Sequence, residues 1–139
     1  MSAMIVLDTH IWFWFIAQEF ERFPKHWREQ IETAAQVGVS IISCYEIALA
    51  QQRGRLELPC PAKQWFEDAL EPSGILLLPL TPQIICCAVD LSPVHRDPFD
   101  RLIIATTIAY EAKLASVDGL FSQYPELANC LMQQTESSS

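Results

Sequence analysis

The chain has 139 residues, of which 50% are hydrophobic, and its 17 Asp and Glu outnumber 9 Lys and Arg to give a formal net charge of -8. This apolar content excludes a disordered acidic protein, and the length is typical of one domain with a core of its own. The negative charge excludes a nucleic-acid-binding protein that relies on a broad basic face. It does not exclude a nuclease whose site itself needs carboxylates.

The elements expected along the chain alternate between short strands and helices. Each strand is a run of about four mostly apolar residues, which suits a strand buried on both faces of a parallel sheet. The helices show apolar positions at helical spacing or a start signal, such as Thr81 and Asp97 each before a proline. In chain order we expect a strand over 4–7, an aromatic-rich segment over 11–15, a helix over 25–36, a strand over 39–42, a helix from 43 to a cap at Gly54, a helix over 61–70, a strand over 75–78, a helix over 82–91, a helix over 98–113 and a strand over 114–117.

Strands that alternate with helices predict an α/β fold, with helices packed on a mainly parallel central sheet. We expect one domain over residues 1–132 and a disordered polar tail over 133–139. The five cysteines include no C-x-x-C pair, so we expect small buried side chains in a reducing cytosol rather than disulfides or a zinc site. No apolar run is long enough to span a membrane and no signal peptide is visible, so we expect a cytoplasmic protein.

Acidic residues stand at the ends of several of these elements. Asp8 and Asp118 each end an apolar strand. Glu46 lies one turn inside the helix after the second strand, and Asp100 lies at the start of the longest helix. Ligands of open parallel sheets bind outside the carboxyl ends of the strands, so we expect these acids to converge there. Clustered carboxylates need compensating positive charge, and hard oxygen ligands select Mg²⁺ or Mn²⁺, which activate water for attack on a phosphodiester.

Each acid also has a local structural interpretation. Ser43 and Glu46 fit the capping box S-x-x-E, in which Glu46 would bind its own helix terminus. Asp8 and Asp118 would cap the elements that follow them. We assign Asp97, which directly precedes a proline, to helix capping, since it fulfils the local rules for an N-cap.

Five segments of the chain, taken in order, resemble the PIN domain family and, more narrowly, the VapC-type toxins of bacterial toxin–antitoxin pairs. The most specific is HRDPFDRLIIA over residues 95–105. The others are MIVLDTH over 4–10, ISCYEI over 42–47, GRL over 54–56 and SVD over 116–118. Together they cover the chain from Met4 to about Leu131.

The resemblance implies a three-layer α/β/α sandwich that works as a Mg²⁺-dependent endoribonuclease, usually forms a homodimer and is inhibited by a small cognate antitoxin protein. It implies catalytic and metal-binding roles for Asp8, Glu46, Asp100 and Asp118. Asp97 would be an accessory acid. Ser116 stands where the family more often has Thr, and its hydroxyl would orient Asp118 or a metal-bound water.

Two further groups of residues are candidates for binding RNA and a protein partner. Arginine suits phosphate contacts, and four arginines lie within or beside the motifs: Arg53, Arg55, Arg96 and Arg101. Arg101 has the alternative of pairing with a nearby acid. The aromatic run holds Trp12, Trp14 and Phe15, which either belong to the core or offer an antitoxin segment a groove for apolar anchors.

Three functions compete at this point. The leading hypothesis is metal-assisted hydrolysis of RNA without a side-chain nucleophile. The alternative is a catalytically silent PIN-like scaffold that acts as a protein-binding module and whose acids are helix caps. A Mg²⁺-dependent phosphatase is disfavoured because the chain has no glycine-rich phosphate loop. His10 and His95 lie near the acids in sequence, yet there is no H-x-x-H pairing, and we assign no histidine to the metal.

Overall fold

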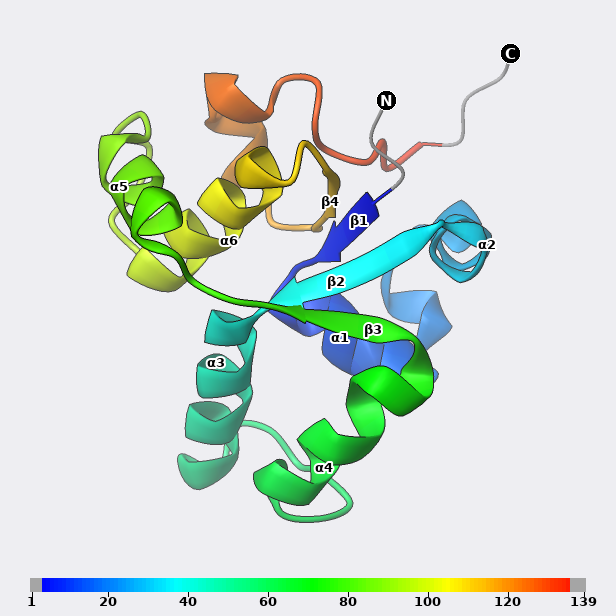
Figure 1. Cartoon of the computed structure of the whole chain (residues 1–139). Coiled ribbons are helices and arrows are strands. Elements are labelled where there is room, and N and C mark those ends of the chain that lie inside the picture. The colour runs from blue at the N-terminus through cyan, green and yellow to red at the C-terminus, as the bar shows by residue number, and fades with distance from the viewer. Residues whose placement is uncertain (1–3, 136–139) are drawn as a thin grey trace.

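Four short strands form one parallel sheet in the order β3-β2-β1-β4 in the computed structural model, which describes residues 4–135 (Figure 1). The strands are β1 (Met4–Leu7), β2 (Gln36–Ser40), β3 (Ile75–Leu78) and β4 (Lys113–Ala115). Every adjacent pair runs in parallel, as the alternation of strands and helices predicts. The chain builds the sheet outward from β1 through β2 to β3 and then returns to place β4 on the other side of β1. In open sheets, ligands bind outside the carboxyl ends of the strands at such a reversal.

The described residues also form six α-helices, which lie on both faces of the sheet (Figure 1). They are α1 (Thr9–Ile16), α2 (Lys25–Thr33), α3 (Ile41–Gln52), α4 (Ala62–Ala69), α5 (Pro82–Asp90) and α6 (Pro98–Ala109). Short 3-10 turns occur at Phe20–Arg22, Glu71–Ser73, Phe121–Gln123 and Pro125–Leu127. The α/β fold predicted from the sequence is confirmed.

Alternating side chains of the strands feed two separate cores. Leu7 and Val39 belong to the core that α1, α2 and α4 cover, where Trp12 is fully buried. Val6 belongs to the core on the opposite face, with Ile104 of α6. Because both faces are covered, the strands are short apolar runs, and the polar residues that follow them lie at the rim of the sheet.

The boundary between β2 and α3 differs from the sequence prediction. The strand expected over 39–42 instead starts at Gln36 and ends at Ser40. The Ser40 hydroxyl accepts a hydrogen bond from the backbone N–H of Ile42 at 3.2 Å, so Ser40 is the N-cap and Ile41 is the first helical residue. The two isoleucines look like strand residues in an apolar run, but the capping serine before them starts the helix.

Two helices end earlier than predicted. The helix expected over 25–36 ends at Thr33, because Ala34 is already extended. The helix expected over 98–113 ends at Ala109, and Glu111 adopts a left-handed φ of 50°, which a continuing helix does not allow. β4 accordingly starts at Lys113 rather than one residue later, and it ends at Ala115.

The cysteines and the tail also differ in part. The five cysteines are free, as expected, but none is fully buried and Cys86 is exposed. The expected polar tail over 133–139 is attached at its start, where the Gln133 carbonyl accepts a hydrogen bond from Trp27 Nε1 at 2.8 Å. Residues 1–3 and 136–139 lie outside the described residues. None of the helices in the described part of the chain has the length and apolar character to cross a membrane.

Candidate metal centre

The four predicted acids come together at the carboxyl ends of the strands, around the reversal between β1 and β4. Asp8 directly follows β1, and Asp118 follows β4. Glu46 projects from α3, and Asp100 lies in the first turn of α6. Their charges influence one another, since Asp8, Glu46 and Asp118 all contribute to raising the pKa of Asp100.

Asp8 is buried and held by two hydrogen bonds. Its Oδ1 accepts from the backbone N–H of Thr9 at 2.8 Å, and its Oδ2 accepts from the Ser116 hydroxyl at 2.8 Å. Burial raises the pKa of Asp8, although both hydrogen bonds act in the opposite direction. Asp8 therefore caps α1, as one interpretation predicted, and at the same time belongs to the acid cluster.

Glu46 is held by a residue that sequence analysis did not single out. The Thr9 hydroxyl donates to Glu46 Oε1 at 2.6 Å, and it lies 2.8 Å from the Ser43 hydroxyl, which must therefore donate to it. Burial raises the pKa of Glu46 to about 7. The capping-box interpretation is wrong, because Ser40 caps α3 and Ser43 lies inside the helix. Thr9 directly follows Asp8 in the sequence, which places its hydroxyl near the acids but does not identify Glu46 as its partner.

Asp100 is disfavoured in its ionised form by both burial and neighbouring carboxylates. Burial is the main reason that its pKa rises to about 8, and repulsion by neighbouring carboxylates adds to the effect. In order of decreasing contribution to the raised pKa, these carboxylates are Asp8, Asp97, Glu46 and Asp118. Its Oδ2 lies 3.3 Å from His95 Nε2.

Ser116 and the two remaining acids complete the surroundings. The Ser116 hydroxyl orients Asp8 rather than the Asp118 carboxylate, and it accepts a hydrogen bond from the Asp118 backbone N–H at 3.2 Å. Asp118 Oδ1 accepts from the Leu120 backbone N–H at 2.9 Å, but the 3-10 turn Phe121–Gln123 begins after Leu120 without a side-chain cap, so the predicted capping of this element by Asp118 is wrong. Asp97 caps α6 as predicted, with Oδ1 2.9 Å from the Phe99 backbone nitrogen.

The chemistry of these donors fits a divalent cation. Among the salt bridges of residues 4–135, none joins a lysine or arginine to any of the clustered acids. In the same residues, no three His, Cys, Asp or Glu side chains group tightly enough to enclose one ion. Mg²⁺ needs no such enclosure, since it usually retains several waters and binds through one or two carboxylates together with substrate phosphates. Buried and half-buried carboxylates that no lysine or arginine of the described chain neutralises therefore match a magnesium site that is open to substrate.

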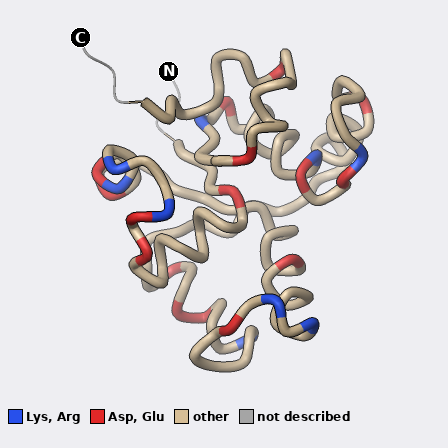
Figure 2. Tube along the Cα trace, turned by 180° about the vertical axis from the view of Figure 1, so that it is seen from behind, with Lys and Arg blue, Asp and Glu red and all other residues tan. Residues whose placement is uncertain are grey.

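Three of the candidate arginines are exposed, and two of these border the acids. Arg53 and Arg55 line a cavity of about 350 Å³ together with Thr9 and Glu46. Arg96 is exposed beside Asp97. Figure 2 shows that Lys and Arg occur at separate places along the described chain rather than on one continuous basic face, which agrees with the exclusion made from the net charge.

Arg101 does not belong with the exposed arginines. Its guanidinium donates to the backbone carbonyls of Ala88, Val89, Leu91, Ser92 and His95, and Nη1 also lies 3.4 Å from the Tyr124 hydroxyl. The five carbonyls alone account for the five N–H groups of the guanidinium. The prediction that Arg101 contacts RNA is therefore wrong, and the residue fastens the segment between α5 and α6.

The aromatic run divides between core and surface. Trp12 is fully buried and donates from Nε1 to the Ala69 carbonyl at 3.0 Å, so its predicted role as a partner contact is wrong. Trp14 and Phe15 are partly exposed. Trp14 lies under the Arg22 guanidinium, with 5.8 Å from Cζ to the ring centroid, and Phe15 packs edge-on against Phe20.

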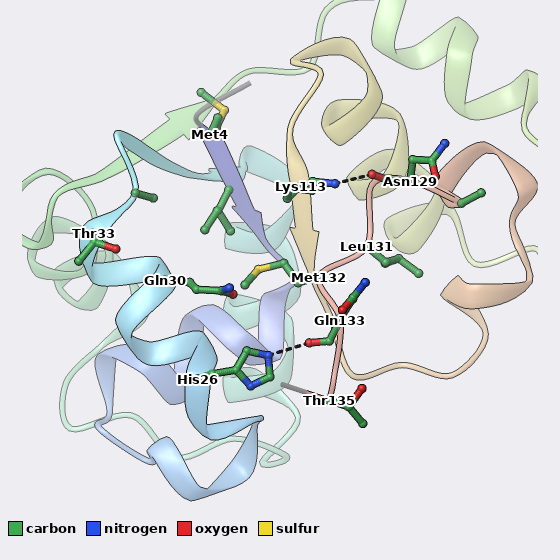
Figure 3. A pocket seen from close by; sticks show the side chains of 13 residues that line it. Met4, His26, Gln30, Thr33, Lys113, Asn129, Leu131, Met132, Gln133 and Thr135 are labelled. Atoms are coloured by element: carbon green, nitrogen blue, oxygen red, sulfur yellow. Dashed lines mark hydrogen bonds between the residues drawn. The ribbon is translucent and has the colours of Figure 1, made fainter. Parts of the chain in front are cut away.

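A second cavity, of about 620 Å³, lies at the amino ends of β1 and β4, on the side of the sheet away from the acid cluster (Figure 3). Its lining includes Met4 and Lys113, which start β1 and β4, and His26, whose Nε2 is hydrogen-bonded to the Gln133 carbonyl. Among the described residues, no Asp or Glu side chain lines it. This cavity is therefore separate from the acid cluster and shares none of its residues.

The sequence model of the PIN domain family matches residues 5–127. The chain belongs to the PIN domain family. Within that family, it is 31% identical over 115 residues to the Ribonuclease VapC22 of Mycobacterium tuberculosis, and the matched region covers 82% of this chain and 86% of that protein. The VapC-type resemblance seen in the motifs is thus supported along most of both chains.

Two solved structures share the fold. The crystal structure of VapBC2 from Rickettsia felis bound to a DNA fragment from its promoter matches with a TM-score of 0.67 and 18% identity, over 93% of this chain and 97% of that chain. A toxin–antitoxin complex from Klebsiella pneumoniae matches with a TM-score of 0.60 and 18% identity, over 96% and 99%. At this identity the comparison bears on architecture, and it confirms the PIN-like α/β/α sandwich.

Proposed function

We propose that the protein is a metal-dependent endoribonuclease of the VapC type, which hydrolyses RNA phosphodiester bonds with Mg²⁺, or Mn²⁺ in its place. The observation that carries the proposal is the group of carboxylates at the reversal between β1 and β4, which pairs with no lysine or arginine of residues 4–135 and in which the pKa of Glu46 rises to about 7 and that of Asp100 to about 8. Groups held at such a cost to the fold are typical of functional sites. The 31% identity to Ribonuclease VapC22 supports the choice of RNA as substrate.

In this proposal, the clustered acids bind the cation and two hydroxyl groups position the acids. Asp8, Glu46, Asp100 and Asp118 would hold the cation, with Asp97 as an accessory acid. When bound, Mg²⁺ supplies a water of lowered pKa and offsets negative charge that develops on the phosphate. Ser116 keeps Asp8 in place through its 2.8 Å hydrogen bond, and Thr9 does the same for Glu46 at 2.6 Å. These buried hydroxyls fix the carboxylates before substrate arrives, which lowers the cost of reorganisation.

RNA would approach from the side of the exposed arginines. Arg53 and Arg55 line the cavity that also includes Glu46, so their guanidinium groups can bind phosphates adjacent to the one that is cleaved. Arg96 would contribute from the segment before α6. Because this basic surface is small, we expect RNA affinity to be weak without the divalent cation.

Two protein contacts belong to the proposal. The first is a small cognate antitoxin, which would cover the partly exposed Trp14 and Phe15. The second is a second copy of this chain, for which α5 offers Ile85 and Val89, 42% and 74% exposed and four residues apart on one helical face. The free cysteines suit the reducing cytoplasm in which we place the protein.

Cleavage of RNA by the purified chain, free of antitoxin, tests the proposal. The wild type is expected to cleave RNA with Mg²⁺ and to be inactive in EDTA. Asp100→Asn should lose nearly all cleavage, whereas Asp68→Asn, the same change at an exposed position of α4, should retain it. Equal activity of Asp100→Asn and wild type would refute the site. A folded wild type that cleaves nothing and binds no Mn²⁺ would favour the alternative, a silent scaffold that binds proteins.

A further inference from the structure

His95 lies between the acid cluster and a buried hydrogen-bonded pair. Its Nδ1 is 2.7 Å from the Tyr124 hydroxyl, and its Nε2 is 3.3 Å from Asp100 Oδ2. The ring packs edge-on against Phe121. The His95 side chain is 14% exposed, and Tyr124 is fully buried. Neither the proposed cleavage chemistry nor the helix-capping pattern assigns a role to this ring.

We propose that Arg101 and Tyr124 fix His95 as the Nε2–H tautomer, and that His95 is thereby a positioning residue that orients the Asp100 carboxylate for the divalent cation. The inference rests on the proposed function for the cation alone, and it does not depend on RNA as substrate. No metal-ligand spacing in the sequence includes His95, so its sequence context alone assigns it no role. The structure places it behind a metal-binding acid instead of in direct contact with the ion.

The direction of the hydrogen bonds in the series Arg101–Tyr124–His95 follows from the chemistry of Arg101. Arg101 Nη1 lies 3.4 Å from the Tyr124 oxygen, and a guanidinium has no acceptor for the phenol hydrogen. The phenol hydrogen then points to the remaining partner, His95 Nδ1, which must accept it. An imidazole that accepts at Nδ1 carries its hydrogen on Nε2, and that nitrogen faces Asp100.

The residues at the end of this hydrogen-bonded series away from Asp100, Arg101 and Tyr124, are held in place by buried contacts. Arg101 is tied to carbonyls of α5 and of the segment before α6, including the carbonyl of His95 itself. The Tyr124 side chain is fully buried, so its neighbours fix the position of its ring. The position of the His95 ring is therefore set by buried neighbours, as expected of groups that orient a metal ligand from behind.

The contact between His95 Nε2 and the Asp100 carboxylate is close but is not a hydrogen bond. His95 Nε2 is buried and makes no hydrogen bond in the described chain, since its 3.3 Å approach to Asp100 Oδ2 is not well aligned. A buried donor without a partner destabilises the fold, because it has lost its hydrogen bonds to water. A donor that faces a metal-binding carboxylate gains its partner when that carboxylate is ionised and turned toward it.

The first test reads the ring directly in the metal-free protein. Nitrogen-15 NMR of the histidine ring distinguishes the two neutral tautomers, and we expect His95 to be Nε2–H. In Tyr124→Phe the preference should disappear, because the donor to Nδ1 is gone. A His95 ring that carries its hydrogen on Nδ1 in the wild type would overturn the inference, whatever the protein does to RNA.

The second test measures Mn²⁺ affinity by calorimetry. His95→Phe should weaken binding about tenfold, the lower part of the range for partners that orient metal ligands. His95→Gln, whose amide N–H can reach the position of Nε2, should recover at least half of the loss on a logarithmic scale. His26→Gln, at the opposite edge of the sheet, should bind Mn²⁺ as the wild type does.

The outcomes separate this inference from the proposed function. Wild-type affinity in His95→Phe, or no recovery in His95→Gln, would overturn the positioning role. A wild type that binds no Mn²⁺ would overturn the proposed metal site, while the NMR spectrum still decides the tautomer. If His95→Phe fails to fold, the comparison of His95→Gln and Tyr124→Phe with the wild type carries the test, since both keep the ring-sized volume of their site largely filled.

Discussion

Replacement of Asp100 by Asn is expected to make the metal-free protein more stable at neutral and alkaline pH. Burial, with added repulsion from Asp8, Asp97, Glu46 and Asp118, raises the pKa of Asp100 from its ordinary value of 3.8 to about 8. The folded state thus keeps a proton on this carboxyl where the unfolded chain has lost it. Removal of the ionisable group should relieve the fold of that cost.

The sign and size follow from linkage. Between about pH 4 and pH 8 folding takes up a proton at Asp100, so the free energy of unfolding falls as pH rises through this range. At ~1.4 kcal/mol per pKa unit, the full change from 3.8 to about 8 sets an upper limit of ~6 kcal/mol. The side chain is 17% exposed and shares its repulsion with Glu46, whose pKa is also raised. We therefore expect Asp100→Asn to gain about 2 kcal/mol at pH 8 and almost nothing at pH 4.

Urea unfolding in EDTA across this pH range measures the effect. Asp68→Asn on the exposed side of α4 is the matched control, and it should follow the wild type at every pH. Addition of Mg²⁺ should reverse the order at pH 8, since an ion that binds only the folded state stabilises it by mass action. An Asn variant that is no more stable than the wild type in EDTA at pH 8, or whose advantage is the same at pH 4, would refute the reasoning.

Three further substitutions test other contacts. Thr9→Val removes the hydroxyl that donates to Glu46 at 2.6 Å and should weaken Mn²⁺ binding about tenfold by calorimetry; unchanged affinity would show that Glu46 needs no such support. Arg101→Lys keeps the charge but loses most of the donors to buried carbonyls, so urea unfolding should show a loss of about 3 kcal/mol, and a loss below ~1 kcal/mol would contradict the fastening role. Gly38→Val should cost about 2 kcal/mol because even a Cβ there would lie 2.8 Å from Leu78 Cδ1, and the double variant with Leu78→Ala should cost less than the two single losses together.

Much of the fold and the placement of the acids follow from local sequence. The run over residues 4–7 ends at Asp8, and the run near Leu114 leads to Asp118, so a parallel arrangement of the two strands alone places both carboxylates at one edge. Asp100 follows from the capping signal at Asp97, which fixes where α6 starts. These predictions need only strand direction and helix start, which are read from residues close in sequence.

The contacts that were missed join residues far apart in sequence. Thr9 and Glu46 are 37 positions apart, and the hydroxyl of a threonine in a D-T-H motif gives no local sign of its partner. Arg101 looked like a phosphate contact because it lies in the most specific motif, yet the carbonyls that surround it come from α5 and the turn before α6. Trp12 was ambiguous for the same reason, since its burial depends on α4.

The β2–α3 boundary shows a different limit. Ile41 and Ile42 have the high β-propensity of strand residues, and an apolar run of four does not distinguish a strand from the start of a buried helix. The hydrogen bond from the Ile42 backbone N–H to the Ser40 hydroxyl decides between them. Ser43 then lies inside the helix and contacts Thr9, which moves Glu46 from the helix terminus to the acid cluster.

Calorimetric titration of the metal-free protein with Mn²⁺ tests the central claim most directly, because it asks whether the acids at the reversal between β1 and β4 hold a divalent cation at all. We predict binding by the wild type and by Asp68→Asn, and loss of binding in Asp100→Asn, with all three proteins folded in the same buffer. A wild type that binds no Mn²⁺, or an Asp100→Asn variant that binds it with wild-type affinity, would contradict the assignment of the acid cluster as the metal site.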